Sequence, residues 1–114
     1  MTPEAHDRHV AVTSHVPHAA AVALVRAATH FASLDTASTG FADTTRLASS
    51  NPPMRADIMC SNRVALAAAL DAYLDEVRAL KDVVLHGDRA TLVAMLEVAH
   101  AQRDAWLHAR TDFA

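Results

Sequence analysis

The chain is poor in residues that make turns and cross-links. Its 114 residues include two glycines, four prolines and one cysteine, and only 4% are aromatic. So few turn residues exclude a β-sandwich or barrel and favour an all-α fold. A single cysteine excludes an intramolecular disulfide and is typical of a reducing cytoplasm. We expect Cys60 to be a small buried hydrophobic residue.

The sequence also lacks a strong charge of one sign and a long apolar run. Ten basic and 13 acidic residues give a net charge of −3, so we expect no nucleic-acid partner. No run approaches ~18 consecutive apolar residues, and we therefore expect no membrane span and no signal peptide. What is abundant is alanine, leucine, valine and histidine. With 52% hydrophobic residues, residues 1–114 should form a single domain with a real core.

A long helix is predicted at the N-terminus. Thr2 can cap it, Pro3 fits its first turn, and Glu4 interacts favourably with the helix dipole. Apolar residues at helical spacing then continue to about His30. Pro17 lies inside this pattern and lacks an N–H donor, so we expect a kink there. A break into two helices near residue 16 is the alternative, but the apolar stripe stays in phase and favours one kinked helix.

An irregular middle segment and two long helices follow. Residues 32–53 are rich in Ser, Thr, Asp and Gly, and a short helix is expected from Met54 to Asn62. A strongly amphipathic helix should end at Gly87, and Asp88 should cap a last helix that runs to about Arg110. We expect the apolar faces of both helices to lie inward or in a homodimer interface: Leu66, Leu70, Tyr73, Leu74, Val77, Leu80 and Val84, then Leu92, Met95, Leu96, Ala99, Trp106 and Leu107.

Two histidine pairs have helical spacing. His15 and His18 stand on either side of Pro17 and should share one helix face. Imidazoles offer donors and acceptors to the hydroxyl or carboxylate groups of a ligand, although half-exposed histidines without a function have the same spacing. His6 and His9 could bind zinc, but the chain has no HExxH motif, and a solvated helix N-terminus is favoured over a metal site.

An arginine follows a glycine in residues 40–46, which read GFADTTR. The guanidinium of Arg46 matches a carboxylate through two parallel hydrogen bonds. Asp43 would fix its rotamer if the segment is helical, and Gly40 would permit a tight turn with positive φ. A surface Asp–Arg pair is the alternative. The two motifs together predict a pocket for a small carboxylate. No glycine-rich phosphate loop or nucleophile elbow is present.

In order and spacing, these motifs resemble the helical C-terminal domain of prephenate dehydrogenases. The resemblance begins with MTPEAHD at 1–7, includes SHVPH at 14–18 and GFADTTR at 40–46, and continues through LASSNP to Asn62. Beyond Asn62 only the helix pattern agrees. The resemblance implies a helical dimerisation domain like the C-terminal domain of 6-phosphogluconate dehydrogenase: a kinked long N-terminal helix, short helices in the middle, and two long C-terminal helices.

The resemblance also implies an activity in tyrosine biosynthesis. Complete enzymes of the family oxidatively decarboxylate prephenate, or its amino counterpart arogenate, with NAD or NADP bound by an N-terminal Rossmann domain. That domain is absent from these residues, so we expect no cofactor and no turnover from this chain alone. The catalytic histidine of the family belongs to the absent domain, so no catalytic residue is assigned here.

Residue by residue, the resemblance implies a substrate site. His15 and His18 would line it, Arg46 would bind a substrate carboxylate, and Asp43 would orient Arg46. Gly40 would shape the loop near the site where tyrosine acts as an inhibitor.

Two positions depart from the family. Ala42 stands where a basic residue is common, and Arg55 stands where a tryptophan often reaches the partner's active site across the dimer. Arg55 would add a cationic contact for a carboxylate or mark an altered specificity.

The sequence leaves three functions open. The favoured one is the dimerisation and substrate-binding domain of a prephenate or arogenate dehydrogenase, acting as a homodimer. The second is a stand-alone domain that binds a prephenate-like or tyrosine-like ligand as a regulator or a cofactor-free enzyme. The third is a helical dimerisation module without a ligand.

Overall fold

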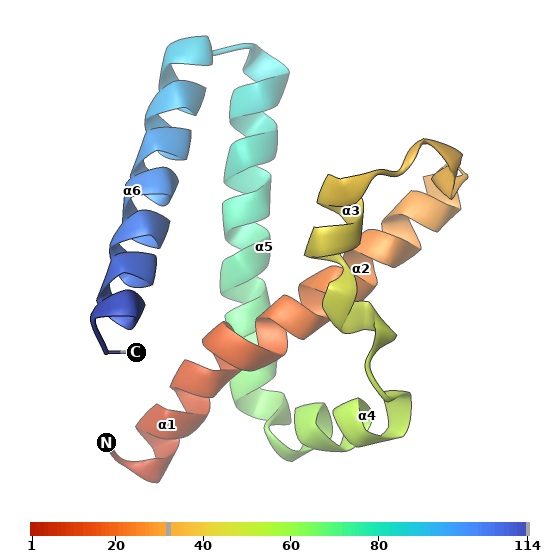
Figure 1. The fold of residues 1–114 in the computed structure, drawn as a ribbon, viewed down its shortest axis with the longest axis vertical. Helices are drawn as coiled ribbons and strands as arrows, with labels where there is room; N and C mark the ends of the chain where they lie inside the picture. The colour runs from red at the N-terminus through yellow and green to blue at the C-terminus, as the bar shows by residue number, and fades with distance from the viewer. Residues whose placement is uncertain (32, 114) are drawn as a thin grey trace. The chain divides into compact units, whose positions relative to one another are not determined.

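All regular structure in the described part of the chain is helical. A computed structural model describes residues 1–31 and 33–113 and confirms the all-α prediction (Figure 1). Contacts divide the chain into two compact units, Met1–Tyr73 and Leu74–Ala114. The long helix α5 (Arg63–His86) contributes residues to both units.

The N-terminal helix of the first unit is continuous but changes its winding before Pro17. It consists of α1 (Pro3–Val10), the π-helical segment η1 (Ala11–His15) and α2 (Val16–Phe31). Thr2 caps it as expected, because its Oγ1 accepts from the Ala5 N–H at 3.1 Å. Pro17 has no N–H for the Thr13 carbonyl. The residues before Pro17 take the wider π winding, and the Val16 N–H bonds to the carbonyl of Ala11. The predicted single, distorted helix is therefore observed, and the π segment is its unpredicted detail.

This run is also long and apolar enough to cross a membrane. An 18-residue window within Pro3–Phe31 reaches a mean hydropathy of 1.2, and 28% of that window is buried. Core helices of water-soluble domains have the same length and composition. In the first unit the run holds buried His15 and His18, and its α2 part packs against η3.

Short helices form the middle of the first unit. They are η2 (Leu34–Thr36), α3 (Thr39–Thr44), η3 (Arg46–Ser49) and α4 (Pro52–Ser61), and η3 packs on α2 (Figure 1). Buried Thr45 separates α3 from η3, and its Oγ1 donates to the Phe41 carbonyl at 2.6 Å. Asn51 caps α4 by accepting from the Met54 N–H at 3.0 Å.

Gly40 does not make the expected turn with positive φ. It lies inside α3, where the Ala42 N–H donates to the Ser38 carbonyl at 3.0 Å, so ordinary helical geometry suffices. Among the described residues, positive φ belongs to Gly87 alone, at 66°.

The buried residues of the first unit are few and unusually polar. The apolar ones are Ala11, Val16, Ala21 and Leu66, and they are accompanied by His15, His18 and Thr45. Buried polar groups need hydrogen-bond partners, so the buried histidines are candidate residues of a ligand-binding site. Cys60 is exposed, which corrects the prediction of a buried thiol. Its neighbours Ile58 and Met59 are the half-buried residues at that end of α4.

The second unit is an antiparallel helical hairpin (Figure 1). Gly87 ends α5, and α6 (Arg89–Phe113) begins after Asp88, whose carboxylate accepts from the Thr91 N–H at 3.0 Å and the Thr91 hydroxyl at 2.6 Å. The predicted helix stop at Gly87 and the predicted cap at Asp88 are therefore both observed.

The apolar faces of the hairpin are not buried within the chain. No residue from 74 to 110 is buried, and Val84 and Trp106 are 61% and 54% exposed. Tyr73, just before the hairpin, is also exposed. Leu92, Met95 and Leu107 are half-buried, so inward packing is wrong only for exposed residues such as Tyr73, Val84 and Trp106, and burial in a homodimer interface stays a prediction. An amphipathic pattern shows that a face is apolar without showing what covers it.

Candidate functional site

His15 is held by Asn62, the residue between α4 and α5. The histidine is 9% exposed, and its Nδ1 lies 3.5 Å from Asn62 Nδ2. The same amide nitrogen donates to the Asp7 carbonyl at 2.9 Å. A carbonyl oxygen only accepts, so this bond fixes which end of the amide faces the imidazole. His15 Nδ1 is therefore the acceptor, and a neutral His15 carries its proton on Nε2.

His18 faces a different environment. It lines an open pocket of about 620 Å³ with residues of α2, η3 and α4. This volume falls within the range of about 300–1,000 Å³ that is typical of small-molecule sites. We call it the His18–Arg55 pocket. Its remaining lining is mostly small or apolar: Ala19, Val22, Ala23, Ala48, Pro52, Ala56 and Met59.

Two residues that line this pocket each carry a buried nitrogen without a hydrogen-bond partner. The two atoms are Nδ1 of His18, a residue only 6% exposed, and Nε of Arg55. Buried polar atoms are normally hydrogen-bonded, and each unpaired one costs about 1–3 kcal/mol. Two such residues lining one pocket indicate that a ligand or ordered water completes their bonding.

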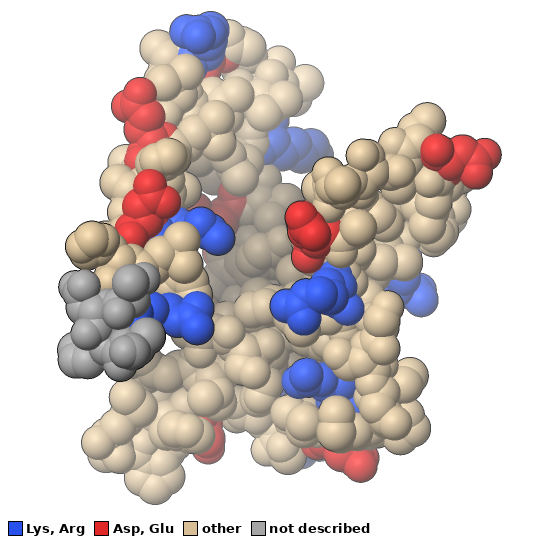
Figure 2. All heavy atoms as spheres, in the orientation of Figure 1, with Lys and Arg blue, Asp and Glu red and all other residues tan. Residues whose placement is uncertain are grey.

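The charge of the His18–Arg55 pocket has one sign. Arg26 and Arg55 line it, and no Asp or Glu is among the lining residues. Ser50 contributes a hydroxyl group. On the outer surface over η3 and α4, basic side chains are visible with acidic side chains near them (Figure 2). The arrangement suits an anionic ligand with an apolar body.

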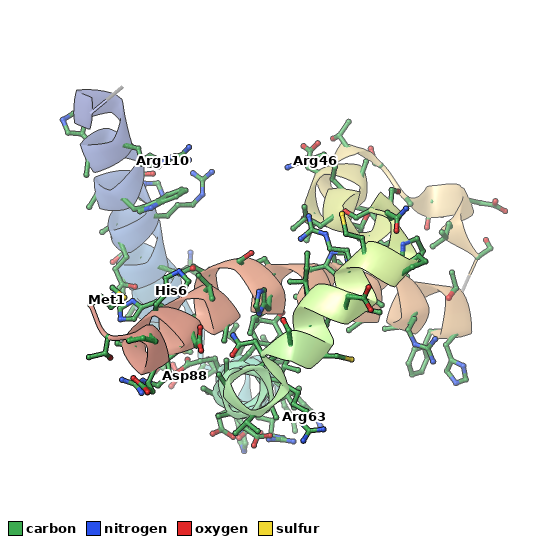
Figure 3. The ribbon with its side chains drawn as sticks, turned by 90° about the horizontal axis from the view of Figure 1, so that it is seen from below. Met1, His6, Arg46, Arg63, Asp88 and Arg110 are labelled. Carbon is green, nitrogen blue, oxygen red and sulfur yellow. The ribbon has the colours of Figure 1, made fainter. Side chains whose placement is uncertain are left out.

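Arg46 and Asp43 lie outside the lining of this pocket. Arg46 is the first residue of η3 and is exposed (Figure 3). Asp43 on α3 is exposed too, and among the described residues no ion pair joins the two. The orientation of Arg46 by Asp43 and the binding of a carboxylate by Arg46 therefore stay predictions.

A larger open pocket lies elsewhere in the first unit. Its volume is about 710 Å³, and residues of α1, the end of α4 and the start of α5 line it. Its lining carries both acidic and basic residues, including Glu4 and Arg63. Neither of the unpartnered nitrogens belongs to it. Size alone does not make it the better candidate.

His6 and His9 show no sign of a metal centre. His6 Nδ1 lies 3.5 Å from the Asp7 carboxylate on the exposed surface. In the part of the chain that the structure describes, no three metal-binding side chains come together.

Sequence reasoning missed Asn62 and Arg26. Asn62 is separated from His15 by 47 positions, and only the fold brings the two together. Arg26 carried a weak signal, because it stands two helical turns after His18 and so shares its side of α2. The π-helical winding was also not predicted. His15 lies against Asn62 before Pro17, whereas His18 lines the pocket after it.

Comparison with known proteins now decides the family. The family model for the "Prephenate dehydrogenase, dimerization domain" matches residues 2–98. The chain belongs to this family. The resemblance carried by the sequence motifs is thereby confirmed, and so is the predicted class of fold.

Relatives of known function are longer than this chain. It is 34% identical over 109 residues to prephenate dehydrogenase of Bacillus subtilis, covering 91% of the chain and 29% of that protein. It is 31% identical over 94 residues to cyclohexadienyl dehydrogenase of Zymomonas mobilis, covering 77% and 32% respectively. The chain thus spans about a third of the length of these relatives.

Solved structures share the fold over nearly the whole chain. Arogenate dehydrogenase from Synechocystis superimposes with a TM-score of 0.87 at 27% identity, covering 93% of this chain and 41% of that one. Prephenate dehydrogenase from Aquifex aeolicus, in complex with hydroxyphenyl propionate and NAD+, gives a TM-score of 0.83 at 32% identity, covering 90% and 38%.

Proposed function

We propose that this chain is the dimerisation and substrate-binding part of a cytoplasmic prephenate or arogenate dehydrogenase. The observation that carries the substrate-binding half is the His18–Arg55 pocket, whose lining is cationic and includes two residues that each carry a buried nitrogen without a partner. Family membership supports the rest.

The chemistry of the substrates fits this pocket. Prephenate carries two carboxylates and a ring hydroxyl on an apolar ring. Arg55 donates to one carboxylate, and His18 donates to the same group or to the hydroxyl. Arg46 on η3 is the candidate for the other carboxylate, in keeping with its role by resemblance. His15 lies outside the lining of this pocket, so its role in substrate binding rests on the resemblance. The share of this chain in the reaction is to bind and orient the substrate.

The nucleotide belongs to another part of the complete enzyme. The relative from Aquifex aeolicus was crystallised with NAD+. In this chain the described residues include no β-strand, and the sequence has no glycine-rich phosphate loop. These residues do not fit a dinucleotide, so none of them is assigned to NAD or NADP.

The second unit supplies the candidate dimer interface. Exposed apolar side chains follow both of its helices, among them Val77, Leu80, Leu96 and Trp106. Large apolar surfaces that stay exposed on one chain mark interaction sites. A second copy of this chain would bury them, in agreement with the dimerization domain that the family model describes.

The binding half is tested by an amide-shift NMR titration of the chain with prephenate. We expect shifts that cluster on α2, η3 and α4 around His18 and Arg55. The titration detects binding even at millimolar affinity, which is expected of a chain that supplies only part of the substrate site. Arg55→Ala should weaken them, whereas Arg78→Ala, which removes an exposed arginine paired with Asp75, should not.

Absence of shifts up to high prephenate concentration would contradict the binding half and leave a dimerisation module without a ligand. Sedimentation equilibrium tests the other half separately. A dimer is expected, and a monomer at high protein concentration would refute it.

A further inference from the structure

The charges around the His18–Arg55 pocket distinguish the two substrates of the family. We infer that the pocket selects an aromatic or cyclohexadienyl acid without an α-ammonium group, and hence the keto acid prephenate over the amino acid arogenate. This inference rests on the proposed function, because it concerns the ligand of the same pocket.

An ammonium group finds poor partners in this pocket. It brings three N–H donors and a positive charge, and it needs acceptors and negative charge in return. Arg26 and Arg55 only donate, and the lining includes no carboxylate. The acceptors left are the Ser50 hydroxyl, the lone pair of a neutral His18 and backbone carbonyls. The nearest acidic residues along these elements, Asp43 on α3 and Asp57 on α4, are exposed and outside the lining.

A carboxylate group meets the opposite conditions. It only accepts, and the guanidinium groups of Arg26 and Arg55, together with the His18 imidazole, offer N–H donors from the pocket lining. A charge-assisted bond to a guanidinium is among the strongest that proteins make. A keto acid therefore gains the attraction of the pocket without the repulsion that an α-ammonium group adds.

Burial makes this discrimination effective. His18 is 6% exposed and the Arg55 Nε is buried, so part of the interaction lies where water and salt screen charges weakly. Like charges brought together at such a site lower affinity for the wrong ligand, which is how charge gives specificity. The same argument makes tyrosine a weak ligand of this pocket.

A matched pair of probes isolates the ammonium group. Hydroxyphenyl propionate and tyrosine share the phenol ring and the carboxylate, and they differ only in the α-ammonium of tyrosine. We expect the chain to bind hydroxyphenyl propionate about tenfold more tightly in NMR or calorimetric titrations, a difference that corresponds to about 1.4 kcal/mol.

Variants show whether the pocket causes the difference. Arg55→Ala should weaken hydroxyphenyl propionate and bring the two affinities together, whereas Arg55→Lys should keep most of the difference because it keeps the charge. Arg26→Ala, on the exposed side of α2, should reduce the difference partly and gives a second test if Arg55→Ala fails to fold. Arg78→Ala is the control with the same change of charge, and it should leave both affinities unchanged.

The outcomes separate the inference from the proposed function. Equal or tighter binding of tyrosine, with hydroxyphenyl propionate and prephenate still bound, overturns the inference alone. A difference that persists in Arg55→Ala and Arg26→Ala also overturns it, because the selection would then come from elsewhere. Failure of prephenate and both probes to bind contradicts the binding half of the proposed function.

Discussion

Replacing Asn62 by alanine should destabilise the first unit well beyond the effect of losing one surface amide. The side chain of Asn62 makes two contacts across the fold, to the Asp7 carbonyl at 2.9 Å and to His15 Nδ1 at 3.5 Å. A typical hydrogen bond contributes about 1 kcal/mol net, and the Asp7 carbonyl keeps the Ala11 N–H as a partner in the variant.

The larger cost comes from His15. Its Nδ1 would lose its donor while the ring stays buried, and a buried group without a partner costs about 1–3 kcal/mol. Because the contact between Asn62 and His15 is long, the cost at His15 should be about 1 kcal/mol, near the lower end of that range. Together with the lost bond to Asp7, the total destabilisation is about 2 kcal/mol. For a domain of this size that corresponds to a fall in Tm of roughly 8 °C.

Thermal unfolding followed by circular dichroism measures this effect. All variants are compared at one protein concentration, because association raises the apparent stability. Ser61→Ala is the matched control, since the Ser61 hydroxyl donates only to the Ile58 carbonyl within its own helix. We expect the control to stay within about 0.5 kcal/mol of the parent. Equal Tm values for Asn62→Ala and Ser61→Ala would refute the reasoning that Asn62 supports His15.

Three further predictions concern the ends of helices. Thr45→Val should lower the free energy of unfolding, measured in urea, by about 1 kcal/mol, because it removes the buried hydroxyl that donates to the Phe41 carbonyl. An unchanged urea midpoint would contradict this. Gly87→Ala should cost about 1–2 kcal/mol in the same assay, since φ is 66° and the added Cβ meets no atom within 4 Å, so that only backbone strain counts. The bonds from Thr91 hold the pKa of Asp88 below its ordinary value of 3.8, so this carboxylate stabilises the fold above that pH and loses its effect as the pH falls through the lowered pKa. Asp88→Asn should remove that part of the acid dependence when unfolding is measured against pH, and an identical pH profile would count against it.

Local signals in the sequence were sufficient for the ends of the helices. Thr2, Gly87 and Asp88 act on backbone groups within a few residues, and the structure has each in the expected role. Long-range features were not accessible in this way. The partner of His15 lies 47 positions away, so no spacing rule points to it.

The candidate site was predicted in part. The sequence indicated His18 and Arg55, and the structure places both in the lining of one pocket. The sequence did not indicate that His15 would lie against Asn62, outside the pocket that His18 lines. Helical spacing assumes uniform winding, and the π-helical segment before Pro17 departs from it. Cys60 shows the same weakness, since a thiol is usually buried but its position on α4 leaves it exposed.

The central claim is that a ligand completes the buried Nδ1 of His18. ¹⁵N NMR of the imidazole nitrogens, recorded with and without prephenate, tests it most directly. We predict that the Nδ1 resonance of His18 shifts as prephenate saturates the chain. His100, which is exposed and paired with Asp104 at 2.9 Å, should keep its resonance. An unchanged His18 resonance while other signals report bound prephenate would contradict the account.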